Sequence, residues 1–177
     1  MNASEDASAR ISDSLAFLIA ARSFRVGAFA ILTNESVRGE HETDRRFVLP
    51  AVMLLGHVIE VYLKAWLSSR GIDNKNLRKQ FGHDLQKLFA EAKKLGLPEP
   101  ERPQHQSFKD LVDSFAKKHG DYTFRYPHEG WTYEVPSMDI VFDVLNDLDV
   151  SVASAFLGEE PEALTVKAKQ VFRLPPG

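Results

Sequence analysis

Cysteine is absent from the sequence, which excludes disulfide bonds, thiolate catalysis and zinc held by cysteine, and fits a reducing compartment. The first residues, Met1 to Asp6, are acidic and lack the basic start and apolar run of a signal peptide. Charged residues interrupt the apolar runs before they reach the ~18–20 residues that span a bilayer. From these absences we expect a soluble, cytoplasmic protein with no membrane segment.

Lysine and arginine are absent from residues 126–163, a stretch that holds 9 acidic residues. Residues 60–125, in contrast, hold 13 basic and 9 acidic residues. This asymmetry has two interpretations: a basic binding face beside an acidic partner face, or two halves that attract each other within the fold or across a dimer. The second is favoured, because the basic excess is small beside that of nucleic-acid-binding domains with a pI above ~9.

The chain of 177 residues shows no internal repeat and no low-complexity stretch, so we expect one domain with a core at about 8–157 and a tail at 159–177. Apolar residues at helical spacing predict a long helix over 8–33. Residues 47–69 predict a second helix that is apolar almost all round and therefore buried. Pro50 fits the first turn of this helix, and Gly71 ends it.

The rest of the chain predicts shorter helices. A polar connection over 73–82 leads to a helix that begins near Asp84 and ends at Gly96, and further helices follow at about 104–118 and 137–157. Strand-forming residues near 122–135 predict a short β-hairpin or an extended loop. The predicted fold class is all-α, an antiparallel four- to five-helix bundle with this one irregular segment.

Three polar residues interrupt the buried helix over 47–69: His57, Glu60 and Lys64. At about 100° per residue they fall within roughly 60° of arc and form one polar seam. One interpretation is a buried Glu60–Lys64 ion pair that fixes helix packing; the other is a polar cleft in which Lys64 meets a phosphate. Di-iron bundles use Glu-x-x-His on two helices, whereas here the order is reversed and occurs once. We therefore expect no metal site and no cofactor.

His83 and Asp84 stand where the next helix begins. Asp84 can cap the free N–H groups of that helix, while His83, with an ordinary pKa near ~6.5, can either assist the cap or do acid–base work. Arg78 precedes His83 by five positions. Such a pair can serve RNA cleavage, the histidine moving the 2′-hydroxyl proton and the arginine stabilising the phosphate transition state.

A further motif, Arg125-Tyr126-Pro127, places an arginine between aromatic residues and before a proline. Arg125 and Tyr126 can bind a phosphate or stack on a base. Alternatively this loop closes one end of the bundle, with Arg125 paired to a carboxylate such as Glu60.

The segments Glu60-Val61-Tyr62-Leu63-Lys64, Gly82-His83-Asp84-Leu85 and Arg125-Tyr126-Pro127, in this order and spacing, resemble the HEPN family, whose helical domains often occur beside nucleotidyltransferases in prokaryotic toxin–antitoxin and stress systems. The resemblance covers about residues 45–157. It implies an antiparallel helical bundle that often forms a homodimer and acts on or binds RNA or nucleotides. Possible partners are therefore a second copy of the chain, a nucleotidyltransferase protein, and RNA or a nucleotide.

Active HEPN ribonucleases use an arginine, four to six intervening residues and a histidine near the start of a late helix, at the dimer cleft. Here His128 follows Arg125 by only three positions, and Arg78 and His83 have the right spacing but precede the third helix. The resemblance thus implies a non-catalytic or weakly active module that binds a nucleotide, RNA or partner protein. The alternative is a metal-independent endoribonuclease, for which the candidate catalytic residues are His83, Arg78, Arg125 and His128. The expected ligand-binding or polar network consists of His57, Glu60, Lys64, Asp84 and Tyr126.

Overall fold

The structure, a computed structural model, describes residues 3–33, 45–99, 107–120 and 136–157. Its elements are all helical, which confirms the all-α class: α1 (Ala3–Thr33), α2 (Arg45–Ser69), α3 (Asn74–Asn76), the π-helical turn η1 (Leu77–Phe81), α4 (Leu85–Lys94), α5 (Phe108–Gly120) and α6 (Met138–Leu157). The hairpin or loop predicted near 122–135 lies outside the described residues. Arg125, Tyr126 and His128 lie outside them for the same reason.

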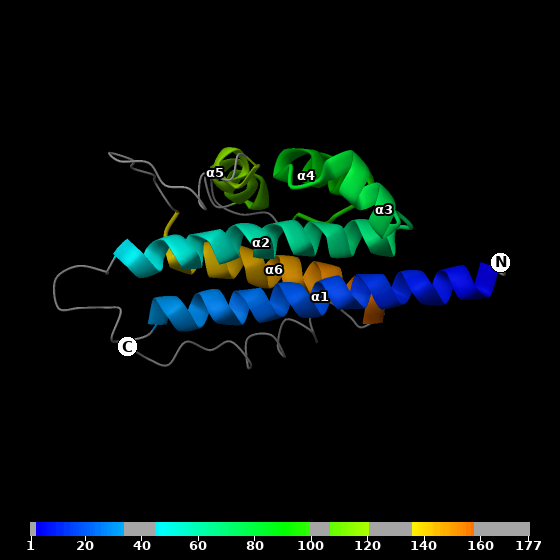
Figure 1. The fold of residues 1–177 in the computed structure, drawn as a ribbon, viewed down its shortest axis with the longest axis horizontal. Helices are drawn as coiled ribbons and strands as arrows, with labels where there is room; N and C mark the ends of the chain where they lie inside the picture. The colour runs from blue at the N-terminus through cyan, green and yellow to red at the C-terminus, as the bar shows by residue number, and fades with distance from the viewer. Residues whose placement is uncertain (1–2, 34–44, 100–106, 121–135, 158–177) are drawn as a thin grey trace.

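Helix α2 lies between two layers of helices (Figure 1). On one side it packs against α1, which runs antiparallel to it, and against α6; on the other side it packs against α4 and α5. This central position explains why α2 is apolar almost all round, because each of its faces meets another helix. Its fully buried apolar side chains are Ala51, Val52, Leu55, Val58, Ile59, Tyr62, Leu63, Ala65 and Leu67.

The start of α2 differs from the prediction. The helix begins at Arg45, so Pro50 lies inside it rather than in its first turn. A proline there removes one backbone hydrogen bond to the preceding turn. Pro50 is exposed and lies in the second turn of the helix, and the helix continues through it. The predicted end is confirmed: Gly71 follows the helix with a φ of 96°.

The connection predicted over 73–82 is helical instead. Asp73 caps α3 by accepting a hydrogen bond from the backbone N–H of Asn76 at 2.7 Å. Leu77 is fully buried and anchors η1 against the core. One buried leucine among polar residues carries no helical period, so this turn of structure could not be read from the pattern.

Side chains also cap α4 and α5. The Asp84 carboxylate accepts a hydrogen bond from the backbone N–H of Lys87 at 3.0 Å, so the predicted cap of α4 is present. Ser107 and Asp110 bond reciprocally at the start of α5, each accepting from the other's backbone N–H at 3.1 Å. This reciprocal cap explains why α5 begins at Phe108.

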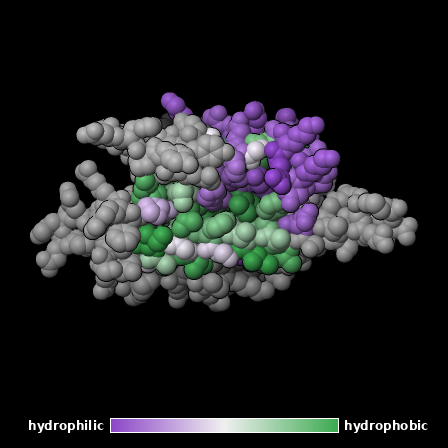
Figure 2. Space-filling view, viewed as in Figure 1, coloured by the Kyte–Doolittle hydropathy of each residue, from purple (hydrophilic) through white to green (hydrophobic). Residues whose placement is uncertain are grey.

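Two helical segments are long and apolar enough to cross a membrane by length and composition, 13–33 and 49–69. The segment in α2 is 78% buried, as expected of a core helix. The segment in α1 is 22% buried, and its exposed large apolar residues are Leu15, Ile19, Phe24 and Val26. Figure 2 shows a hydrophobic area over α1 and α2. Burial in the core explains why the segment in α2 is apolar, whereas the segment in α1 presents an apolar face on the surface of the bundle.

Candidate functional site, a buried glutamate surrounded by histidines

Glu60 is the centre of the polar seam of α2. Lys64, one turn further along the helix, donates to Glu60 Oε1 at 2.5 Å. His119 Nε2 lies 2.6 Å from Glu60 Oε2, and His83 Nδ1 lies 3.0 Å from both carboxylate oxygens. His57 Nδ1 is 3.7 Å from Oε2. One carboxylate therefore gathers three imidazoles and one ammonium group, and we call these five residues the Glu60 cluster.

The Glu60 carboxylate is ionised despite its burial. Glu60 is 3% exposed and Lys64 8% exposed. Burial alone would raise the pKa of Glu60, but the contacts with His119, His57 and Lys64 together hold that pKa well below its usual value. An ionised carboxylate can only accept hydrogen bonds, so Nε2 of His119 and Nδ1 of His83 must carry the protons that they share with it.

Two helices and one turn supply the cluster, and local sequence explains each placement. His57, Glu60 and Lys64 share one face of α2 because they are three and four positions apart. His83 follows Gly82, whose φ of 54° turns the chain between η1 and α4. His119 lies in the last turn of α5. The cluster thus joins α2 to α5 and to the turn that precedes α4.

The sequence analysis missed His119. The residue lies four positions after Phe115 and seven after Val112, on the buried face of α5, and it is 6% exposed. The sequence does carry a signal for this residue, because His119 continues the apolar helical stripe of α5. Gly56 makes room for it, since a Cβ atom at position 56 would lie 2.7 Å from His119 Nδ1.

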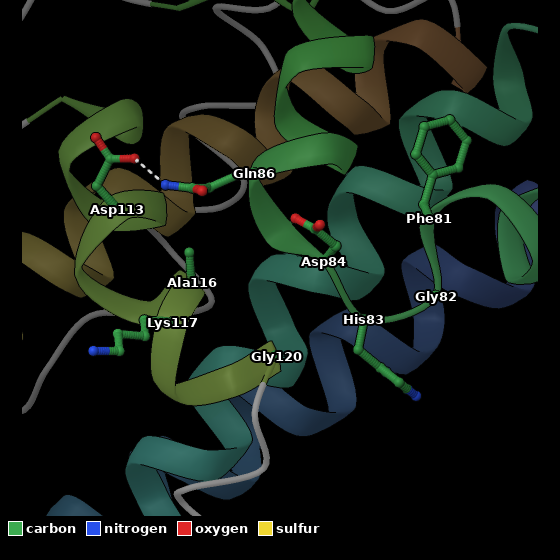
Figure 3. Close-up of a pocket in the computed structure, with 9 residues that line it drawn as sticks. All are labelled: Phe81, Gly82, His83, Asp84, Gln86, Asp113, Ala116, Lys117 and Gly120. Carbon is green, nitrogen blue, oxygen red and sulfur yellow. Dashed lines mark hydrogen bonds between the residues drawn. The ribbon is translucent and has the colours of Figure 1, made fainter.

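His83 connects the cluster to a surface pocket of about 740 Å³ (Figure 3). Its side chain is 42% exposed, whereas the Glu60 side chain that holds it is 4% exposed. Asp84 also lines this pocket, beside the side chains of α5. A buried carboxylate that orients a pocket histidine is the arrangement that fixes an imidazole for proton transfer or for binding.

Arg78 lines a different pocket from His83. Asn74, Lys75, Arg78 and Lys79 surround a cavity of about 490 Å³ on α3 and η1. We call these four residues the basic groove. Within the described part of the chain, none of its three cations takes part in an ion pair. Arg78 and His83 are close in sequence, but the structure brings them to separate cavities rather than to one site.

A second buried polar network lies on the opposite side of α2. Asp149 of α6 is 2% exposed and accepts hydrogen bonds from Arg22 Nε at 2.7 Å and from Tyr62 Oη at 2.9 Å. Arg25, 1% exposed, lies nearby with Nη2 at 3.9 Å from Asp149. The Asp149 hydrogen bond raises the pKa of Arg22, and burial raises that of Tyr62. The sequence analysis did not identify this network, which ties α1, α2 and α6 together.

Fold and site together define a class: an all-α bundle whose central helix carries a carboxylate–histidine–lysine cluster beside a pocket. Comparisons with protein-family models, with curated proteins and with solved structures find no match.

Proposed function

We propose that this chain is a HEPN-like helical module that binds RNA or a nucleotide through the basic groove. The observation that carries the proposal is the set of three cations at this groove, Lys75, Arg78 and Lys79, without a carboxylate partner among the described residues. Phosphates are bound by such positive charges, and Asn74 adds a neutral donor beside them.

The charge of the surrounding surface supports the same proposal. Residues 74–94 hold 6 basic and 2 acidic residues. Figure 2 shows hydrophilic residues gathered over α3 and α4, the elements that carry this excess. A basic face of this kind attracts a polyanion and makes its binding depend on salt.

A direct test measures the affinity for a fluorescently labelled single-stranded RNA of roughly 16 nucleotides by anisotropy, in EDTA and over a series of salt concentrations. The variant Lys75→Gln/Arg78→Gln/Lys79→Gln removes the three groove cations. We expect weaker binding and a salt slope reduced by about 2, because each lost phosphate contact on a single strand lowers it by ~0.7.

The matched control, Lys109→Gln/Lys117→Gln/Lys118→Gln, removes the same charge from three lysines of α5, outside residues 74–94. It should bind nearly as the unmodified protein does. Equal loss in both variants, or no binding at low salt by the unmodified protein, would refute the proposal.

The second candidate function is a metal-independent ribonuclease, favoured by the contact between Glu60 and His83. A neutral ring that donates from Nδ1 carries its lone pair on Nε2, where it can accept the 2′-hydroxyl proton as that oxygen attacks the phosphate. This candidate predicts cleavage of total RNA in EDTA that His83→Ala abolishes in folded protein. If the unmodified protein does not cleave RNA, the ribonuclease candidate is excluded and the binding module remains.

The apolar face of α1 supports a homodimer. Leu15, Ile19 and Val26 are 42%, 57% and 50% exposed. At about 100° per residue they lie within roughly 40° of arc, so they form one stripe along the helix. Exposed Ala30 and Ser23 lie beside the stripe and are small enough for the same helix of a second copy to approach closely. We propose that the two copies pack α1 against α1.

A further inference from the structure

We propose that the chain binds one zinc ion through His57, Glu60 and His119. Their candidate ligand atoms, Nδ1 of His57, a carboxylate oxygen of Glu60 and a ring nitrogen of His119, all lie within 4.8 Å of one another. This site goes beyond the proposed RNA binding, which uses other residues and is tested in EDTA.

The distances fit the geometry of a zinc site. Zinc bonds of ~2.0–2.1 Å to nitrogen and oxygen in a tetrahedron place neighbouring ligand atoms about 3.3 Å apart. Glu60 Oε2 lies 2.6 Å from His119 Nε2 and 3.7 Å from His57 Nδ1. All three atoms lie within 4.8 Å of one another, so side-chain movements of roughly 1–1.5 Å bring them to this spacing around an ion.

The donor set selects zinc. Two imidazoles and one carboxylate suit zinc, and three protein ligands leave a fourth position for water or a bound molecule. Magnesium and calcium prefer oxygen ligands, so two histidines disfavour them. Glu60 can serve with Oε2 while Oε1 keeps its hydrogen bond from Lys64.

Surrounding residues hold two of the three ligands in place. The His119 side chain is 5% exposed and that of Glu60 4% exposed, whereas His57, at 21%, reaches the surface and provides the way in. The His57 and His119 rings are perpendicular, with centroids 5.0 Å apart. To bind zinc through Nε2, a neutral His119 would carry its ring proton on Nδ1, so that the Nε2 lone pair faces the ion.

Isothermal titration of EDTA-treated, dialysed protein with zinc tests the site, and cobalt(II) absorption reports its geometry. We expect one zinc per chain, intense visible bands of tetrahedral cobalt, and an affinity that falls by at least about tenfold in His57→Gln. His57 is the ligand least involved in the core, so this variant should fold, which circular dichroism checks.

The matched control is His41→Gln/His105→Gln, which removes two histidines outside the described residues and should bind as the unmodified protein does. No zinc binding by the unmodified protein, a weak octahedral cobalt spectrum, or equal affinity in His57→Gln would overturn the proposal. Because RNA binding is measured in EDTA, either proposal can fail without the other.

Discussion

At the scale of single residues, Glu60 is the acceptor that holds Lys64, His83 and His119 together inside the bundle. A buried carboxylate needs partners, since an isolated buried charge costs several kcal/mol or more. The seam on α2 identified Glu60 and Lys64 from sequence because both lie on the same helix, three and four positions from their neighbours. His119 could not be paired with Glu60 in this way, because only the packing of α5 against α2 brings the two together.

Gly56 gives a prediction at this scale. In an ordinary helix position, glycine to alanine stabilises by roughly 1 kcal/mol. At Gly56 the new Cβ would lie 2.7 Å from the His119 ring, so we expect Gly56→Ala to destabilise the protein by about 1–3 kcal/mol through overpacking. Urea unfolding measures the change.

Gly27→Ala is the control, because its Cβ meets only Leu54 Cδ1, at an ordinary 3.7 Å. It should be neutral or stabilising. If the two substitutions have the same effect, His119 does not lie against Gly56.

Asp149 gives a second prediction. Asp149→Ala removes the shared acceptor of the partly exposed Arg22 and of the buried Tyr62 hydroxyl, and leaving that hydroxyl without its acceptor should cost about 1–3 kcal/mol. Tyr62→Phe removes one hydrogen bond and should cost only about 0.5–1.5 kcal/mol. Chemical denaturation of both variants checks the order, and a larger loss in Tyr62→Phe would contradict it.

At the scale of elements, helix caps and buried leucines set the boundaries. The α4 cap was predictable because an aspartate directly before an amphipathic helix is a local signal. The helical turn around Leu77 was not, because its stability comes from burial against α2 rather than from its own sequence. The sequence therefore predicted the long helices, whose apolar period is sustained, better than the short ones.

Asp84→Ala tests the α4 cap. Loss of the hydrogen bond to the Lys87 N–H should destabilise the protein by about 0.5–2 kcal/mol. Asp113→Ala removes an aspartate paired on the surface of α5 and should cost much less. Thermal melting compares them, and equal losses would show that Asp84 does not cap.

The same cap has a pH dependence. Burial would raise the pKa of Asp84, but the hydrogen bonds from Lys87 and Gln86 and the charge of Lys87 together lower it. A lowered pKa means that the stabilisation is present above the ordinary value of ~3.9 and is lost as the pH falls below it. The stability difference between the unmodified protein and Asp84→Ala should therefore shrink in acid.

At the scale of the whole molecule, α1 is the element whose environment the rest of the bundle explains least. Its stripe of Leu15, Ile19 and Val26 remains exposed. Ile19→Lys should convert a dimer to a monomer in multi-angle light scattering, since burying an unpaired ammonium group in an apolar interface is costly. The control Asp13→Lys places a lysine at an exposed polar position of the helix, away from the stripe. If the unmodified protein is monomeric at all concentrations, the proposed packing of α1 against α1 is contradicted.

The account rests on Glu60 as the acceptor that organises His83 and His119, and histidine tautomers test this most directly. Long-range ¹H–¹⁵N NMR spectra of metal-free protein at about pH 8, above the ordinary histidine pKa of ~6.5, distinguish the two ring nitrogens. We predict that His119 carries its proton on Nε2 and His83 on Nδ1, and that Glu60→Gln removes the preference of His83. A proton on Nε2 of His83 in the unmodified protein would contradict the account.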